Sequence, residues 1–365
     1  MRPTRGRIVR LDKRSEEIDV PAGELAYVVV RHEGRFVRRY VVEGPVHLSG
    51  AEEAPGRNVA SSVTALPASA VSVVVATRDR PEELASCLAA LAAHASGVRE
   101  IVVCDSASSN PGAIADVVRG SATLVRCESP GLSLARNTGA SRATGDVIAF
   151  LDDDCVVEPG WLDGIRGGFS DGRVAAVTGS YIPFELQTEA QLLFLRYAHM
   201  DKRGFESPVR FSVARSESKH WPLDAWRMGS GGNMAVRAET FRALGGFRLD
   251  LGLGSPARGG EDLFLLWSIV RAGLDVVYRP DAMVSHRHHR DVASLHRVLS
   301  GYGVGHAAYL AAARAAGAAG TRLYAASVLY DRAKRAAAAL FAGDRARLAL
   351  VRHEVRGLLG RARPA

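Results

Sequence analysis

The sequence predicts an α/β protein whose sheet is mostly parallel and covered by helices. Apolar runs of strand character alternate with amphipathic helical segments from residue 71 onward. Polar clusters directly follow several of the apolar runs, and the most acidic of them, Asp152 to Asp154, ends such a run. Alternation of this kind builds parallel sheets, and such sheets bind ligands at the carboxyl ends of their strands. We therefore expect a ligand site where these clusters converge.

The elements of this central region follow in order. The first expected helix has Pro81 in its first turn and two acids after it, which suits the positive end of a helix. The expected strands are 71–76, 101–104, 124–125 and 147–151, and the expected helices are 81–91 and 132–141.

Different patterns flank the central region. Two β-rich runs, 26–31 and 36–42, surround a turn that contains Gly34 and predict a hairpin in a small leading domain. Residues 51–69 are rich in Pro, Gly and Ser and read as a linker. Beyond Asp291 the chain is Ala-rich with helical spacing. The expected units are a β-rich domain with its linker (1–68), a central domain (69–290) and a helical basic region (291–365).

Composition places the protein among ordinary globular chains. Of its 365 residues 47% are hydrophobic and 24% are charged. The basic N-terminus is not followed by the apolar segment of a secretory signal, so none is expected. No apolar run elsewhere approaches the roughly 18 to 20 residues needed to cross a bilayer. We expect a cytoplasmic protein without a nucleic-acid partner. The four cysteines lack CxxC spacing, so reduced core thiols are expected rather than a zinc site or disulfides.

The net charge of +8 comes from the C-terminal region. From Asp291 onward 12 Lys or Arg stand against 4 Asp or Glu, which accounts for the whole excess. A helical cap on the central domain is the first interpretation of this region. The other is contact of the basic helices with anionic lipid at the inner face of a membrane, or with an anionic acceptor. Both interpretations remain open.

Three adjacent carboxylates repel one another unless a cation neutralises them. Asp152 and Asp154, spaced as DxD, can face the same way where the chain leaves the strand. We expect Asp154, with Asp152, to bind Mn²⁺ or Mg²⁺, and Asp152 and Asp153 to contact the ribose or phosphate of the ligand that the cation binds. A solvated acidic loop is the alternative.

Polar residues at neighbouring strand ends suit a nucleoside. Asp105, followed by three serines within four positions, can bond a ribose or base edge, while Thr77 and Arg78 hold the base. The alternative is an Asx turn that caps the next helix. Arg136, about one turn into its helix, steadies Asp105 or the nucleotide in one interpretation and forms a structural salt bridge in the other.

Two later segments add acid–base and metal-binding groups. Glu261 and Asp262 begin an amphipathic helix after a glycine pair, and a carboxylate there suits a general base as well as the helix dipole. His286 and His288 follow a strand, and an imidazole joined to carboxylates suits Mn²⁺ or Mg²⁺ bridged to phosphate. The segment 229–236 has too many glycines for strand or helix and lets the backbone approach a sugar.

These segments together resemble family 2 glycosyltransferases of the GT-A fold, and the leading domain is similar to N-terminal extensions of actinobacterial members. The resemblance covers about residues 71–290. Its motifs, in the family's order, are VSVVVATRDRPEELASCLAAL, VVCDSASS, GLSLARNTGASRATGDVIAFLDDDC, GSGGNMAVRAETFRALGGF and GGEDLFLLWSIVRAG.

The resemblance implies an inverting, metal-dependent hexosyltransferase that moves a sugar from a nucleotide sugar, with UDP expected, to an acceptor hydroxyl. It implies that Thr77, Arg78 and Asp105 hold the nucleoside and that Asp262 of the Glu-Asp pair is the catalytic base. Asn110 stands where the family often has an acid, which leaves the identity of the nucleobase in the donor open. The QxxRW signature of processive synthases is absent. A nucleotidyltransferase or a non-catalytic nucleotide-binding module remains the alternative.

Overall fold

The computed structural model describes residues 5–11, 18–32, 35–48, 66–198, 207–215 and 218–360. Its leading part is β-rich. Strands β1 (Arg5–Leu11), β3 (Glu24–His32) and β4 (Arg35–Glu43) form one sheet, and β2 (Ile18–Val20) pairs with β5 (Val46–Leu48). β3 and β4 are antiparallel, which confirms the predicted hairpin, although its Gly34 turn lies outside the described residues.

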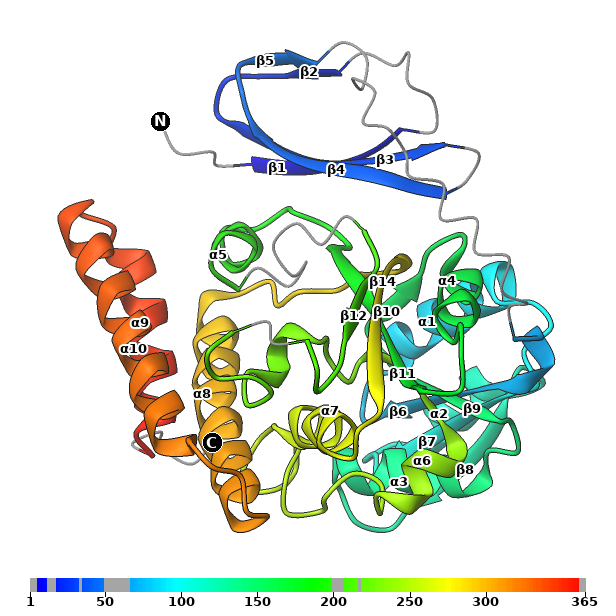
Figure 1. The fold of residues 1–365 in the computed structure, drawn as a ribbon. Coiled ribbons are helices and arrows are strands. Elements are labelled where there is room, and N and C mark those ends of the chain that lie inside the picture. The colour runs from blue at the N-terminus through cyan, green and yellow to red at the C-terminus, as the bar shows by residue number, and fades with distance from the viewer. Residues whose placement is uncertain are drawn as a thin grey trace.

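This leading sheet packs on the central domain and lies above it in Figure 1. Leu25, Tyr27 and Val29 of β3 form a buried cluster with Ile182 and Met283 from the central sheet. The alternation of polar and apolar residues that predicts the hairpin thus also gives β3 an apolar face, and the central sheet covers that face.

The central sheet has nine strands in the order β10-β14-β11-β13-β9-β6-β7-β8, and β12 also pairs with β14. Six strands, from β6 to β9 with β11 and β14, run in one direction, and β10, β12 and β13 run against them. The predicted α/β class with a mostly parallel sheet is confirmed. The strands are β6 (Val71–Thr77), β7 (Glu100–Ser106), β8 (Thr123–Cys127), β9 (Val147–Asp152), β10 (Cys155–Val157), β11 (Val174–Pro183), β12 (Val209–Phe211), β13 (Asn233–Arg237) and β14 (Asp275–His286).

Helices cover both faces of this sheet. Alternate residues of β6 separate two cores, since Val74 belongs to one and Val73 and Val75 belong to the other. Such alternation is the period-two pattern of a strand buried on both sides. The helices of the central domain are α1 (Pro81–His94), α2 (Pro111–Val118), α3 (Leu132–Arg142), α4 (Trp161–Gly168), α5 (Glu189–Ala198), α6 (Ala238–Ala243) and α7 (Glu261–Arg271), with short 3₁₀ turns at Ala68–Ala70 and Ala225–Arg227.

The expectation of no strand within 229–236 is wrong in its second half. β13 begins at Asn233, immediately after the last glycine, and pairs with both β9 and β11. The glycines lie in the loop before the strand, and the segment that follows them is long enough to form a strand of the sheet. The linker prediction falls largely on residues 51–65, which lie outside the described residues.

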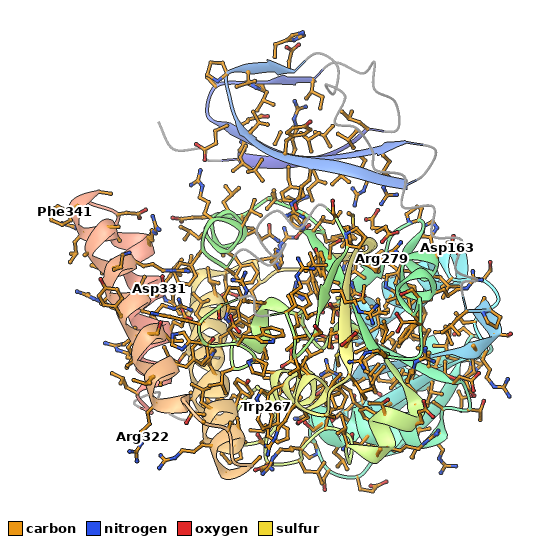
Figure 2. All side chains as sticks on the ribbon, viewed as in Figure 1. Asp163, Trp267, Arg279, Arg322, Asp331 and Phe341 are labelled. Carbon is orange, nitrogen blue, oxygen red and sulfur yellow. The ribbon has the colours of Figure 1, made fainter. Side chains whose placement is uncertain are left out.

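The C-terminal region is helical, as predicted. It forms α8 (Val292–Ala315), α9 (Thr321–Phe341) and α10 (Arg345–Leu358), which stand beside the central domain in Figure 1. Gly305 of α8 lies so close to Gly259 and Gly260 that an added Cβ would approach their backbone to 2.9 Å. α9 is the outer helix, and Phe341 at its end points away from the body (Figure 2). None of the described helices is long and apolar enough to span a bilayer. The unit boundaries at 68/69 and 290/291 stay predictions.

Candidate active site at the carboxyl edge of the sheet

The three consecutive carboxylates at the end of β9 have three different environments. Asp152 accepts a hydrogen bond from Arg136 at 2.6 Å, and the buried Asp153 accepts one from the Thr77 hydroxyl at 2.8 Å. Asp154 lies 3.3 Å from His286 at the end of β14. Burial and the neighbouring Asp154 charge raise the pKa of Asp153 to about 7. The triplet is therefore a set of individually held groups rather than a solvated loop.

Asp154 and His286 form the arrangement most suited to a metal ion. One carboxylate oxygen of Asp154, one ring nitrogen of His286 and the sulfur of Cys155 lie within 4.8 Å of one another. Asp154 Oδ1 is buried and lies 3.3 Å from His286 Nε2, but it accepts no well-formed hydrogen bond from the described residues, which leaves it available to a cation. Burial opposes ionisation of Asp154, but His286 and Arg80 outweigh it and hold its pKa below the usual range.

The donor set fits Mn²⁺ or Mg²⁺ better than a thiophilic metal. Burial and then the Asp154 and Asp152 charges raise the pKa of the Cys155 thiol, which keeps it protonated and a poor ligand. One carboxylate and one imidazole leave most coordination positions open for phosphate and water oxygens. All four cysteines are free and buried, as predicted.

The two candidate histidines differ in their contacts. The His286 ring contacts Asp154, whereas His288 meets the His286 ring, Nδ1 to Nδ1, at 2.9 Å and packs on Phe194 at 4.5 Å between ring centroids. Burial and then His286 lower the pKa of His288, while the charge of Asp154 overcomes burial and raises that of His286. His286 is thus the histidine placed at the acidic cluster, and His288 lies behind it.

Arg80 is a member of the site that the sequence does not single out. It donates to Asp153 at 3.1 Å and to Asp154 at 3.0 Å. Arg78 is instead half-exposed and lies 3.5 Å from Asp79. Asp79 has a φ of 56°, so the chain turns between the two arginines and only the second faces the acids. Arg78 stays a predicted nucleoside contact.

Asp105 stands at the end of β7, and both of its oxygens already have protein partners. Asp105 Oδ1 accepts a hydrogen bond from the Ser108 backbone at 2.8 Å, a local side-chain turn one residue longer than the Asx turn of the open alternative. Asp105 Oδ2 pairs with Arg126. Arg126 therefore has the role considered for Arg136, and its signal in the sequence is only its place near the end of the next strand. The helix α2 that follows is capped by Asn110, not by Asp105.

Arg136 joins the two halves of the site. Its buried guanidinium donates to Asp152 at 2.6 Å and to Glu261 at 2.9 Å. Of the interpretations left open for Arg136, the structure contains the salt bridge and no contact with Asp105. Burial and then the Asp262 charge raise the pKa of Glu261 to about 7, against the opposing effect of Arg136.

Asp262 is the member of the Glu-Asp pair that reaches the surface of the site. It is half-buried, and one of its oxygens accepts a hydrogen bond from the Gly231 backbone at 2.9 Å. A Cβ on Gly231 would lie 2.9 Å from the Asp262 Cβ, and one on Gly232 would lie 2.1 Å from an Asp152 oxygen. The glycines are required by this close approach of the loop to both acids.

α8 contributes a side chain to the same edge. Burial, and then the charges of Asp154, Asp152 and Asp262, raise the pKa of Tyr302. Its side chain is nevertheless 44% exposed, so it borders the site rather than filling it. Helical spacing alone does not reveal which turn of a later helix reaches an acidic cluster.

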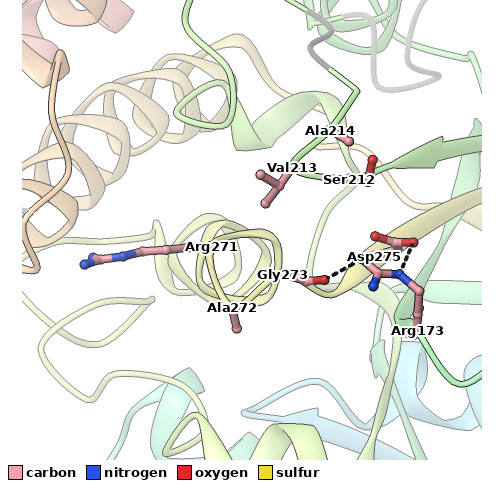
Figure 3. Close-up of a pocket in the computed structure, with 8 residues that line it drawn as sticks. All are labelled: Arg173, Ser212, Val213, Ala214, Arg271, Ala272, Gly273 and Asp275. Atoms are coloured by element: carbon pink, nitrogen blue, oxygen red, sulfur yellow. Dashed lines mark hydrogen bonds and ion pairs between the residues drawn. The ribbon is translucent and has the colours of Figure 1, made fainter.

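A pocket of about 730 Å³ lies elsewhere, at the edge where β11 and β14 begin. Figure 3 shows Arg173 there, donating to the Gly273 carbonyl at 2.9 Å and lying 3.7 Å from Asp275. None of the predicted site residues lines this pocket. It belongs to the opposite edge of the sheet from the acidic cluster.

Known proteins share the central domain. Residues 72–245 match the family described as "Glycosyl transferase family 2". The "Pre-mycofactocin glycosyltransferase" of Mycobacterium tuberculosis is 31% identical over 225 residues, which are 60% of this chain and 43% of that protein. The "Succinoglycan biosynthesis protein ExoM" of Rhizobium meliloti is 28% identical over 228 residues, which are 59% of this chain and 65% of that protein. The chain thus spans less than half the length of its mycobacterial relative.

Among solved structures, the mannosyltransferase PcManGT from Pyrobaculum calidifontis, in complex with GDP-Man and Mn²⁺, aligns with a TM-score of 0.49. It has 20% sequence identity and covers 82% of this chain and 91% of that one. The family match falls on the strands and helices that carry Thr77, Asp105 and the Asp152 to Asp154 triplet. Residues 72–245 are thus similar to glycosyl transferase family 2, the family that the sequence motifs resemble.

Proposed function

We propose that this protein is an inverting glycosyltransferase that moves a sugar from a nucleotide sugar to an acceptor hydroxyl, with UDP as the expected nucleotide and Mn²⁺ or Mg²⁺ as the cofactor. One observation carries the proposal. Arg136 ties Asp152, in the triplet beside the Asp154–His286 pair, to Glu261, the neighbour of Asp262. A single buried cation therefore joins Asp152 to Glu261, the residue that directly precedes the candidate base Asp262.

The donor half of the site would hold the nucleotide sugar. Asp154 and His286 would bind the metal, with Asp152 beside it. A bound divalent cation would supply charge neutralisation to the departing diphosphate. Thr77, Arg78 and Asp105 would contact the nucleoside, and Asp105 is held for this by Arg126 and the Ser108 backbone.

The acceptor half depends on Asp262. Its carboxylate would take the proton of the incoming hydroxyl as that oxygen attacks the anomeric carbon opposite the departing phosphate, so that the configuration inverts in one displacement. The hydrogen bond from Gly231 fixes the orientation of this carboxylate. Glu261 is buried and bonded to Arg136, so its role here is to position Asp262 and Asp152.

The test is nucleotide release. Thermal shift with Mn²⁺ across UDP- and GDP-sugars should first identify a stabilising donor, and nucleotide release from that donor should then be metal-dependent. Loss of release with retained donor stabilisation in Asp262→Asn would support catalysis. Donor binding with no release from the wild type under any acceptor tested would favour the non-catalytic module, and release of pyrophosphate from a nucleoside triphosphate would favour nucleotidyl transfer.

A further inference from the structure

Large apolar side chains are exposed on the two last helices. Phe341 is 95% exposed, the most of any large apolar side chain among the described residues. Leu340 beside it is 61% exposed. Further examples on the same helix pair are Leu323, Tyr330 and Leu359. Isolated exposed apolar residues are common, but adjacent ones at a projecting end indicate a contact surface.

Leu340 and Phe341 are the last two residues of α9 and lie just before the turn to α10. Gly343, with a φ of 62°, reverses the chain, and Arg345 and Arg347 at the start of α10 are exposed beside it. Figure 2 shows Phe341 pointing away from the rest of the molecule. We define these four side chains, Leu340, Phe341, Arg345 and Arg347, as the tip.

The acids near the tip are already engaged. Asp344 caps α10 by accepting a hydrogen bond from the Arg347 backbone at 3.0 Å. Asp331 pairs with Arg332 and Arg335, and Glu354 pairs with Arg332. Within the described part of the chain, neither Arg345 nor Arg347 forms an ion pair with a carboxylate. The tip therefore presents two apolar side chains beside two exposed arginines that form no ion pair with a described carboxylate.

We propose that the tip docks on an anionic lipid surface, with Leu340 and Phe341 inserted among the acyl chains and Arg345 and Arg347 at the headgroup phosphates. This pattern is that of a peripheral membrane contact, in which apolar burial and charge attraction act together. A second copy of the chain fits less well, because a symmetric contact would place the same arginines against each other. The inference does not depend on the proposed transfer reaction, because docking needs no donor.

The experiment is co-sedimentation of the full chain with sucrose-loaded vesicles. Vesicles with 40% phosphatidylglycerol in phosphatidylcholine should bind the protein, pure phosphatidylcholine should bind it far less, and 0.5 M NaCl should reduce binding. Phe341→Ser should lower the partition coefficient roughly 10-fold, as expected for losing one buried aromatic side chain. The double variant Arg345→Gln/Arg347→Gln should lower binding to anionic vesicles and remove most of its salt dependence.

Leu323→Ser is the matched control. Leu323 is also highly exposed on α9 but begins the helix, roughly 27 Å from Phe341 along its axis. It should leave vesicle binding unchanged. Equal losses in the two serine variants, or no preference for anionic vesicles, would overturn the tip assignment. A concentration-dependent dimer in light scattering that Phe341→Ser dissolves, without vesicle binding by the wild type, would assign the tip to a second copy instead.

Discussion

Arg31 donates a hydrogen bond to Glu158 at 2.6 Å, and this ion pair between two distant segments is buried on both sides. Arg10 adds a second contact to Glu158 at 2.8 Å, and the Ser285 hydroxyl donates to the same carboxylate. Ser285 directly precedes His286 in β14, and β10, which ends just before Glu158, contains Cys155. The leading β-sheet is therefore fastened to the strand pair that carries the candidate metal site.

Glu158→Gln should destabilise the protein by about 3 kcal/mol, because it leaves the buried Arg31 without its counter-charge. Denaturant unfolding measures this free energy. Glu43→Gln is the matched control, since Glu43 pairs with Arg196 at 2.7 Å but is half-exposed and should cost less than about 1 kcal/mol. Equal effects of the two substitutions would show that the Glu158 contact is not buried in solution.

Asp262→Asn should lower turnover by roughly 10²-fold or more, because the amide cannot accept the acceptor's proton. Donor affinity should change little, since Asp262 bonds to the Gly231 backbone rather than to the donor half of the site. Nucleotide release measured at saturating donor tests this. Asp250→Asn, at an exposed carboxylate paired with Arg248, should retain full turnover. Wild-type turnover by Asp262→Asn would exclude Asp262 as the base.

Gly231→Ala should reduce turnover at least about 10-fold, because the new methyl group would meet the Arg136 guanidinium at 2.8 Å and the Asp262 Cβ at 2.9 Å. We expect a stability loss of about 1 to 3 kcal/mol from the same crowding. Gly172→Ala is the control, because a Cβ there meets nothing within 4 Å. Full activity in Gly231→Ala would mean that the loop is looser than the described contacts imply.

His306 predicts a loss of stability in acid. Burial and then the nearby Arg332 charge lower its pKa from 6.5 to about 4. The unfolded chain therefore binds a proton on this ring below pH 6.5, while the folded chain resists binding it until about pH 4. Stability present above pH 6.5 is lost as the pH falls through this window, by at most about 3 kcal/mol.

Unfolding free energies at pH 7.5, 6 and 5 measure the effect of His306. His306→Gln should make the decline between these pH values shallower than in the wild type. His94→Gln, at the exposed end of α1, should leave the decline unchanged. An unaltered decline in His306→Gln would mean that other groups account for the acid sensitivity.

The strands that begin near residues 71, 101, 124 and 147 and the helices that begin near 81 and 132 could be predicted, because apolar period and turn residues are local signals. The helices α2 and α4 to α6 and the strands β10 to β12 were not predicted. The convergence of Thr77, Asp105 and the acidic triplet also followed, since parallel strands share one carboxyl edge. Which arginine faces the acids did not follow, because the positive φ of Asp79 decides between Arg78 and Arg80.

Contacts between distant segments could not be predicted from the sequence either. Arg31 and Glu158 are 127 positions apart, and neither lies in a motif that names the other. α8 packs closely on the loop before α7 because Gly305 lies against Gly259 and Gly260, and neither glycine segment indicates the other in the sequence. The choice of His286 over His288 depends on where β14 ends, because the sequence places both histidines after the strand, whereas His286 is its last residue.

The most direct measurement is the anomalous scattering of manganese in crystals soaked with MnCl₂ and UDP. The account predicts one strong peak within about 2.3 Å of both an Asp154 carboxylate oxygen and the His286 ring nitrogen. UDP phosphate oxygens should complete its coordination, and the peak should vanish in Asp154→Ala. A peak away from Asp154 and His286, or UDP bound in full without manganese beside the acidic triplet, would contradict the account.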